Sequence, residues 1–145
     1  MGKLSRRDFY WIIILCGILI SLASLEVLAK AKDLDYFNFI NSSLQAAGEP
    51  VLTFEDFVIS MLSSYVAKAI VPVGLALTTW VAFTKTGFNM TYIFSWSVFI
   101  LAALAFQILS LELSSIFYYL FILLYLLLFV QLIRTSHHAK KEEGK

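Results

Sequence analysis

The sequence predicts an all-α integral membrane protein in which four apolar helices form one bundle. Hydrophobic residues make up 60% of the 145 residues, and the mean hydropathy is +0.82, which places the chain outside the soluble class. Four apolar runs are separated by polar or charged segments, and each run can cross a hydrocarbon core about 30 Å thick. We therefore interpret residues 1–145 as a single membrane domain.

The first span is expected at residues 9–29. Phe9 to Leu25 is a run of seventeen residues without a charge, and a basic flank precedes it. Two targeting features compete with this interpretation, because the segment 5–9 (SRRDF) resembles a twin-arginine export motif and Val27 to Ala29 resembles a cleavage site. Cleavage would leave three spans, whereas the length of the run and Glu26 just before the cut favour a retained span.

The loop at residues 30–55 is expected to lie outside the membrane and to contain a short amphipathic helix. Asp33 is placed to cap this helix, and Gly48 with Pro50 would end it. Four apolar or aromatic residues would share one face, namely Tyr36, Phe37, Ile40 and Leu44. Such a helix would lie on the membrane surface or cover one end of the bundle.

The other spans are expected at residues 56–83, 90–111 and 113–134. Residues 53–56 (TFED) have the pattern of a capping box at the start of the second span. A tight turn at residues 84–89 would lead into the third span, and Glu112 would mark a short turn before the fourth. The remaining residues 135–145 form a tail of mixed charge, which we expect in the cytosol.

The distribution of basic residues predicts that both termini are cytoplasmic. Eight Lys and Arg residues fall on the side of the termini: Lys3, Arg6, Arg7, Lys85, Arg134, Lys140, Lys141 and Lys145. The opposite side carries only Lys30 and Lys32. Because cytoplasmic loops are enriched in Lys and Arg, this asymmetry favours a multi-pass protein of the cell inner membrane with its N- and C-termini inside.

A polar stripe crosses the second span and holds the leading candidate for a functional residue. Ser60, Ser64, Lys68 and Pro72 recur every four residues, so they share one face of the helix. Pro72 leaves the carbonyl of Lys68 without its helical donor, so the ammonium, the carbonyl and two hydroxyls are placed to share one small site. A charge at this depth is expensive and is expected to face a partner or water, which is typical of functional residues and also of structural ion pairs.

Three residues are candidate partners for Lys68. Glu26 lies near the outer end of the first span, and the opposite tilt of side chains in antiparallel helices would bring it close to Lys68. Gln107 and Glu112 lie at similar levels on the neighbouring hairpin and are alternatives. Glu26 has a simpler option, because Lys30 lies one helical turn away on the same helix.

The residue types argue against an enzyme and predict no cofactor and no bound metal. Cys16 is the one cysteine, so the chain cannot form an internal disulfide, and the adjacent His137 and His138 cannot clamp a haem between spans. No metal-ligand cluster, catalytic triad or phosphate loop can be assembled from the membrane-facing residues. A net charge of +1 gives no reason to expect nucleic acid as a partner.

Three classes of function remain open. The first is a homo-oligomeric sensor or ion-permeation element, in which the stripe of several copies lines a water path in the bilayer. The second is an accessory subunit that packs through the alanine face of the third span against a larger membrane complex. In either class the basic tail is available to a cytosolic partner. The third is a small proton-coupled exporter in which Glu26 exchanges protons with a cationic substrate.

The layout also resembles a known family. In length, in four-span arrangement, in residues 62–65 (LSSY) and in residues 129–132 (FVQL) before a charged tail, the chain is similar to the membrane protein family of the lambda Rex exclusion system. The resemblance implies depolarisation of the membrane during phage infection. The longer outer loop, Lys68 and Pro72 depart from that family, and a lysine on the stripe would repel cations and favour anions or a closed, sensing state.

Overall fold

A computed structural model describes residues 4–87 and 89–143, together with all of their side chains except those of Thr86 and residues 138–143. Over these residues the chain is helical, with no strand, and the elements are α1 (Arg6–Ala31), α2 (Leu34–Ala46), α3 (Phe54–Val81), η1 (Ala82–Thr86), α4 (Met90–Leu109) and α5 (Ile116–Glu143). The expected all-α class is therefore confirmed for the described chain.

Four of the helices are long and apolar enough to cross a membrane. These candidate spans are Arg6–Ala31, Phe54–Lys85, Met90–Leu109 and Ile116–His137. Each lies where the hydropathy of the sequence predicts it, because an uninterrupted apolar run leaves the backbone no partner in lipid other than its own helix.

Side-chain caps set where the helices begin. Ser5 caps α1, and its hydroxyl accepts a hydrogen bond from the backbone N–H of Asp8 and donates one to the carboxylate of that residue. Thr53 and Asp56 repeat the arrangement at α3, and Asp33 caps α2 by accepting from two backbone N–H groups. Each cap satisfies donors that the first turn of a helix leaves free.

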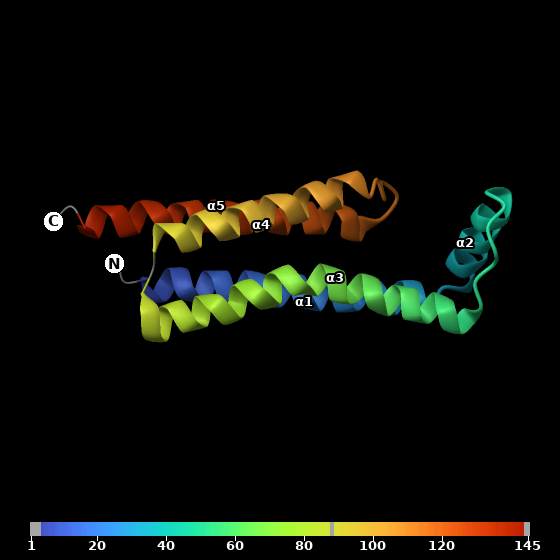
Figure 1. Ribbon diagram of the computed structural model, residues 1–145, viewed down its shortest axis with the longest axis horizontal. Helices are drawn as coiled ribbons and strands as arrows, with labels where there is room; N and C mark the ends of the chain where they lie inside the picture. Colours follow the sequence, from blue (N-terminus) through green and yellow to red (C-terminus); the bar gives the residue numbers. More distant parts are fainter. Residues whose placement is uncertain (1–3, 88, 144–145) are drawn as a thin grey trace.

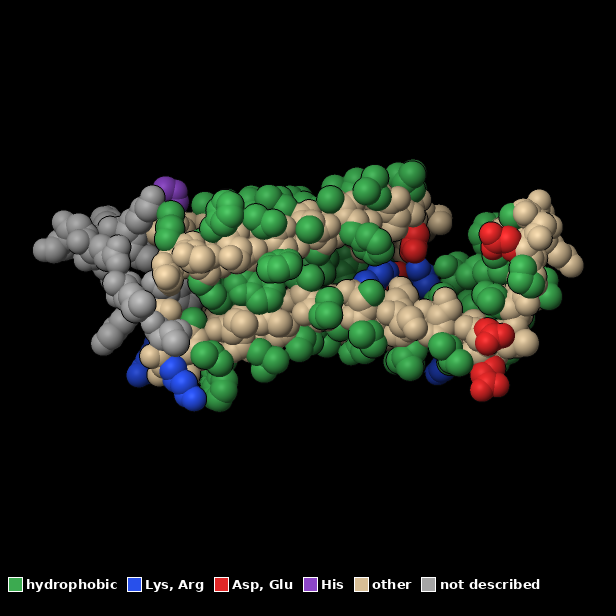
Figure 2. Space-filling view, in the orientation of Figure 1, with side chains coloured by type: hydrophobic (Ala, Val, Ile, Leu, Met, Phe, Trp, Pro, Cys, Tyr) green, Lys and Arg blue, Asp and Glu red, His purple; other side chains and the backbone are tan. Residues whose placement is uncertain are grey.

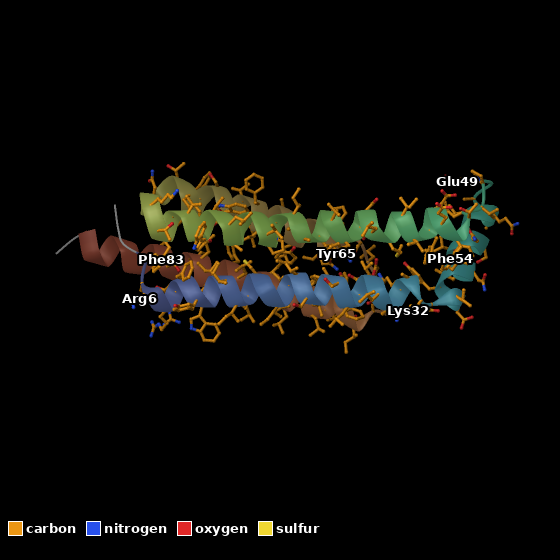
Figure 3. The ribbon with its side chains drawn as sticks, turned by 90° about the horizontal axis from the view of Figure 1, so that it is seen from below. Arg6, Lys32, Glu49, Phe54, Tyr65 and Phe83 are labelled. Atoms are coloured by element: carbon orange, nitrogen blue, oxygen red, sulfur yellow. The ribbon has the colours of Figure 1, made fainter. Side chains whose placement is uncertain are left out.

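The four long helices are arranged in two layers (Figure 1). One layer consists of α1 and α3, which run antiparallel, as the labelled residues Arg6 and Phe83 at one end and Lys32 and Phe54 at the other make clear (Figure 3). The other layer consists of α4 and α5 (Figure 1), and the helix pairs α1–α3, α4–α5 and α1–α5 make the main contacts. The start of α1 and the end of α5 lie at one end of the molecule, here called the termini end, and α2 lies at the opposite end.

A buried apolar core lies between the layers. It includes Ile12 and Leu19 from α1, Leu75 from α3, Ile100 from α4 and Leu128 from α5. Many other large apolar side chains point outward along the length of the helices, as expected for surfaces that face acyl chains.

The α3–α4 contact is narrower than the others and centres on one glycine. A Cβ atom added at Gly74 would lie 2.9 Å from Cη2 of Trp96, so the Trp96 ring packs directly on the α3 backbone. Pockets open on both sides of this contact, near Thr78 and Asn89 towards the termini end and near Lys68 and Gln107 towards the α2 end. The α3–α4 interface is therefore narrow, and a pocket opens on either side of the Gly74–Trp96 contact.

Several boundaries differ from those expected. The second span continues through the π-helical turn η1, so residues 84–86 of the expected tight turn at 84–89 are helical. The fourth helix starts at Ile116 and continues to Glu143, so most of the segment expected as a tail is helical. Ala, Lys and Glu dominate residues 139–143, and these residues have high helix propensity, which explains the extension.

Candidate functional site

Lys68 of α3 forms an ion pair with Glu26 of α1. The Lys68 ammonium lies 2.6 Å from Oε2 of Glu26, and the exposed fractions of the two side chains are 13% and 2%. The ammonium also lies 5.2 Å from the centroid of the Phe121 ring on α5, within cation–π range. Residues of α1 and α5 thus contact one lysine of α3 whose side chain is largely buried.

Glu26 is shared between two lysines. Its second oxygen, Oε1, lies 2.8 Å from the ammonium of Lys30, one turn along α1. Lys30 in turn lies 2.5 Å from Oε2 of Glu112, which belongs to the turn between α4 and α5. The four side chains of Lys68, Glu26, Lys30 and Glu112 form a chain of contacts that we call the charge network.

The charge network runs from the interior of the molecule towards the α2 end. Figure 2 shows Lys or Arg and Asp or Glu side chains gathered between the two layers near the α4–α5 turn, beside mainly hydrophobic side chains along the helices. Two ammonium groups and two carboxylates have formal charges that sum to zero. This balance offsets part of the desolvation penalty that each of these charges carries alone.

Glu26 contacts both of the partners considered for it in the sequence, Lys68 and Lys30. Side chains tilt towards the N-terminus of their own helix, so those of the antiparallel α1 and α3 lean towards each other and close the distance between Glu26 and Lys68. The i,i+4 spacing on α1 brings Lys30 to the other carboxylate oxygen. Glu112 contacts Lys30 rather than Lys68, so its place in the site is indirect.

The polar stripe does not form the single small site that its spacing suggested. Pro72 is buried and Lys68 faces α1 and α5, but Ser64 is only half-buried and Ser60 is exposed. Towards the α2 end α3 extends beyond the α4–α5 turn (Figure 1), so this part of the stripe has no neighbouring layer to face. The Lys68 carbonyl is approached instead by the hydroxyl of Tyr125, at a long distance of 3.5 Å.

Gln107 lies beside Lys68 without bonding to it. It is 3% exposed, and its Nε2 atom has no hydrogen-bond partner among the described residues. Gln107, Lys68 and Tyr125 line one cavity with a volume of about 250 Å³, whose other walls are apolar. Gln107, which the sequence offered as an alternative partner of Lys68, therefore lines a cavity next to the charge network.

A second buried polar contact was missed in the sequence. Asp8 is 1% exposed, and one of its carboxylate oxygens accepts a hydrogen bond from Nε2 of Gln131 on α5 at 3.0 Å. Ser5 and Asp8 lie within the SRRDF segment that resembles an export motif, and in the folded chain these two residues form a capping box. The spacing of Ser5 and Asp8 was the available signal for the cap, but nothing in the sequence identified Gln131 as a partner.

A further polar link joins α3 to α4 near the termini end. The hydroxyls of Thr79 and Tyr92 are hydrogen bonded at 2.5 Å, and the Thr79 side chain is fully buried. Together with the Gly74–Trp96 contact, this bond holds the narrow α3–α4 interface. Neither contact involves a charged side chain. The charge network therefore remains the leading candidate for the functional site.

Neither metal ligation nor a known family explains the site. Within residues 4–87 and 89–143, no group of three His, Cys, Asp or Glu side chains is placed to hold a metal ion. Cys16 is buried in the core. Comparisons with protein-family models, curated proteins and solved structures found no match to this chain.

Proposed function

We propose that this chain is a homo-oligomeric protein of the inner membrane that acts as a sensor or ion-permeation element, with the charge network as its control point. The observation that carries the proposal is the position of Glu26, which is 2% exposed and bonded to both Lys68 and Lys30. Ionisable groups at this depth in a membrane protein are rare and commonly mark ion pathways, relays or sensors.

The network supports a closed resting state within each chain. Lys68 is neutralised by a carboxylate of its own chain, and its ammonium contacts Glu26 of α1 and the Phe121 ring of α5. Opening a path along α3 therefore requires the Lys68–Glu26 contact to break. A change in either charge, or in the electric field across the ion pair, would shift the equilibrium between the closed and open states.

The proposed topology is a four-helix bundle with both termini in the cytoplasm. The eight basic residues assigned to the termini side and the two assigned to the α2 side favour this orientation. In this topology α2 lies outside the cell, and Lys30 and Glu112 lie near the outer membrane interface. The network then leads from the outer interface into the hydrocarbon core.

Phage exclusion is the biological setting that we propose for this activity. The support is the resemblance in layout and in residues 62–65 and 129–132 to the membrane protein family of the lambda Rex system. Because Lys68 and Pro72 depart from that family, we propose a tightly closed element that opens on a stimulus during infection rather than a constitutive pore.

Ion flux through reconstituted protein tests the proposal. The purified chain is placed in liposomes with a set membrane potential, and ion entry is followed with a fluorescent indicator. The Lys68→Met variant leaves Glu26 with one ammonium partner, so we expect a leak at least about tenfold above that of the native chain, with preference for cations. The charge-swapped pair Glu26→Lys with Lys68→Glu should return the leak towards the native level.

Lys32→Met is the matched control, because Lys32 is exposed and forms no ion pair among the described residues. It should behave as the native chain does. Equal and low flux in all variants under every potential would contradict the permeation proposal. The mass of the protein extracted in mild detergent then tests for an accessory subunit. An accessory subunit would be a monomer when expressed in a foreign host and part of a larger complex with other proteins in its native host.

The exporter class receives less support from the geometry. Both carboxylate oxygens of Glu26 are occupied by lysines of the same chain, which leaves no free oxygen for a cationic substrate in this state. We accordingly propose a role without catalysis and without a resident cofactor.

A further inference from the structure

The cavity beside the charge network has an opening, a polar floor and apolar walls. It lies between α3, α4 and α5, and exposed residues of two helices, Ala67 and Phe106, form its rim. Gln107 and Tyr125 are buried and form its floor, and Lys68 lies at one side. Figure 2 shows a hollow at this place, between the two layers and next to the charged side chains.

Gln107 supplies the observation that points to a ligand. A buried amide N–H group without a partner costs about 1–3 kcal/mol, so it is expected to be satisfied by a molecule that the protein binds. Nε2 of Gln107 has no protein partner, and the residue lines the cavity. The ligand must therefore offer a hydrogen-bond acceptor at the floor.

The size and the walls of the cavity favour a hydrocarbon chain. Its volume of about 250 Å³ exceeds that of cavities of about 150 Å³ that bind benzene in protein cores. Apart from Lys68, Gln107 and Tyr125 the walls are alanine, valine and phenylalanine side chains. Because the rim lies on the apolar surface between α3 and α4, the molecules that reach it are the acyl chains of the bilayer.

The depth of Gln107 identifies the acceptor. The 20 residues of α4 span about 30 Å, the thickness of the hydrocarbon core. Gln107 precedes the end of α4 by two residues, or about 3 Å, so it lies close to the boundary where the ester groups of phospholipids begin. The charge network next to the cavity is neutral overall, which favours an uncharged ester carbonyl over a carboxylate.

We propose that this cavity binds one acyl chain of a membrane phospholipid, whose ester carbonyl oxygen accepts a hydrogen bond from Nε2 of Gln107. Lys68 lies beside the same cavity, so the bound lipid contacts the charge network directly. The proposed function does not require this lipid. The lipid proposal rests on the cavity and on the buried amide of Gln107.

Native mass spectrometry of the full chain, extracted in mild detergent from nanodiscs of defined lipid, tests the proposal. The probes are a diacyl phosphatidylethanolamine and its dialkyl ether analogue of the same chain length, which lacks ester carbonyl groups. We expect the native chain to retain one diacyl lipid, and to retain the ether analogue about fivefold less, as one lost hydrogen bond of about 1 kcal/mol predicts. Gln107→Leu should abolish this preference.

A matched pair of alanines tests the cavity itself. Ala103→Phe places a ring in the cavity, whereas Ala105→Phe makes the same change on an exposed residue of α4 that does not line it. We expect lipid retention to fall about tenfold in the first variant and to stay at the native level in the second. Gln107→Leu provides an independent reading if Ala103→Phe fails to fold.

Three results would overturn the assignment. They are equal retention of the ester and ether lipids by the native chain, equal loss in both alanine variants, and retention of a free fatty acid in preference to the phospholipid. The assay measures the mass of bound lipid and does not depend on ion flux. Its result therefore stands even if the permeation proposal fails.

Discussion

Lys68 and Glu26 lie 42 residues apart in the sequence, and their charged atoms lie 2.6 Å apart between α1 and α3. The contact ties together the two helices that make up one layer of the molecule (Figure 3). Since Glu26 also bonds Lys30, and Lys30 bonds Glu112, a change at Lys68 reaches the turn between α4 and α5 through two further contacts.

We expect Lys68→Met to lower the free energy of unfolding by about 2 kcal/mol, because Glu26 loses one of two charged partners in a buried place. Unfolding of the purified chain in mixed detergent micelles measures the change. Glu26→Gln and the double variant complete a cycle, and the double variant should be at least about 1 kcal/mol more stable than the sum of the single effects predicts. Strict additivity, or an equal loss in Lys32→Met, would show that the pair contributes nothing.

Gly74→Ala and Gly17→Ala make the same change in two helices and should have opposite effects. At Gly74 the new Cβ atom meets the Trp96 ring at 2.9 Å, whereas at Gly17 it meets nothing within 4 Å. We expect Gly74→Ala to destabilise the chain by about 1 kcal/mol through displacement of the ring. Gly17→Ala should stabilise it by up to about 1 kcal/mol through helix propensity. Thermal unfolding followed by circular dichroism measures both, and a stabilised Gly74→Ala variant would contradict the close α3–α4 packing.

Asp8→Ala should destabilise the chain more than Asp56→Ala does. Both residues complete capping boxes, with Ser5 and Thr53, but Asp8 is buried and also accepts a hydrogen bond from Gln131 on α5. The loss of that bond leaves the Gln131 amide unsatisfied, so the difference should be about 1–2 kcal/mol. Equal unfolding free energies for the two variants would mean that the α1–α5 bond does not form.

Labelling of single cysteines tests the proposed sidedness. In a Cys16→Ser background, Lys32→Cys should react with a membrane-impermeant maleimide in spheroplasts, in which the inner membrane is exposed and sealed. Lys85→Cys, at the termini end, should react only after the membrane is permeabilised. The reverse pattern would overturn the assignment of both termini to the cytoplasm.

Cys16 provides an internal check on packing. Its side chain is fully buried in the core between the layers. A small membrane-permeant thiol reagent should therefore leave the folded protein unlabelled, and label it fully once the chain is unfolded in strong detergent. Rapid labelling of the folded protein would mean that the two layers separate in solution.

The elements that the sequence predicted are those set by local chemistry. Hydropathy located the four spans, and Asp33 and Thr53 marked the starts of α2 and α3, because apolar runs and side-chain caps act within a few residues. The fourth span was expected to end at residue 134, and the helix itself continues to Glu143 because residues 139–143 have high helix propensity.

Which polar side chains meet was decided by the tertiary structure. Spacing put Ser60, Ser64, Lys68 and Pro72 on one face of the helix, but the α4–α5 layer ends before α3 does at the α2 end, so Ser60 is exposed. Glu26, Gln107 and Glu112 were all candidate partners for Lys68. The antiparallel packing of α1 and α3 brought Glu26 to Lys68. The packing of the α4–α5 layer against them left Gln107 at a cavity and brought Glu112 to Lys30. A helical period fixes the direction of a side chain around its own axis, and the rotation and offset of neighbouring helices determine what that side chain contacts.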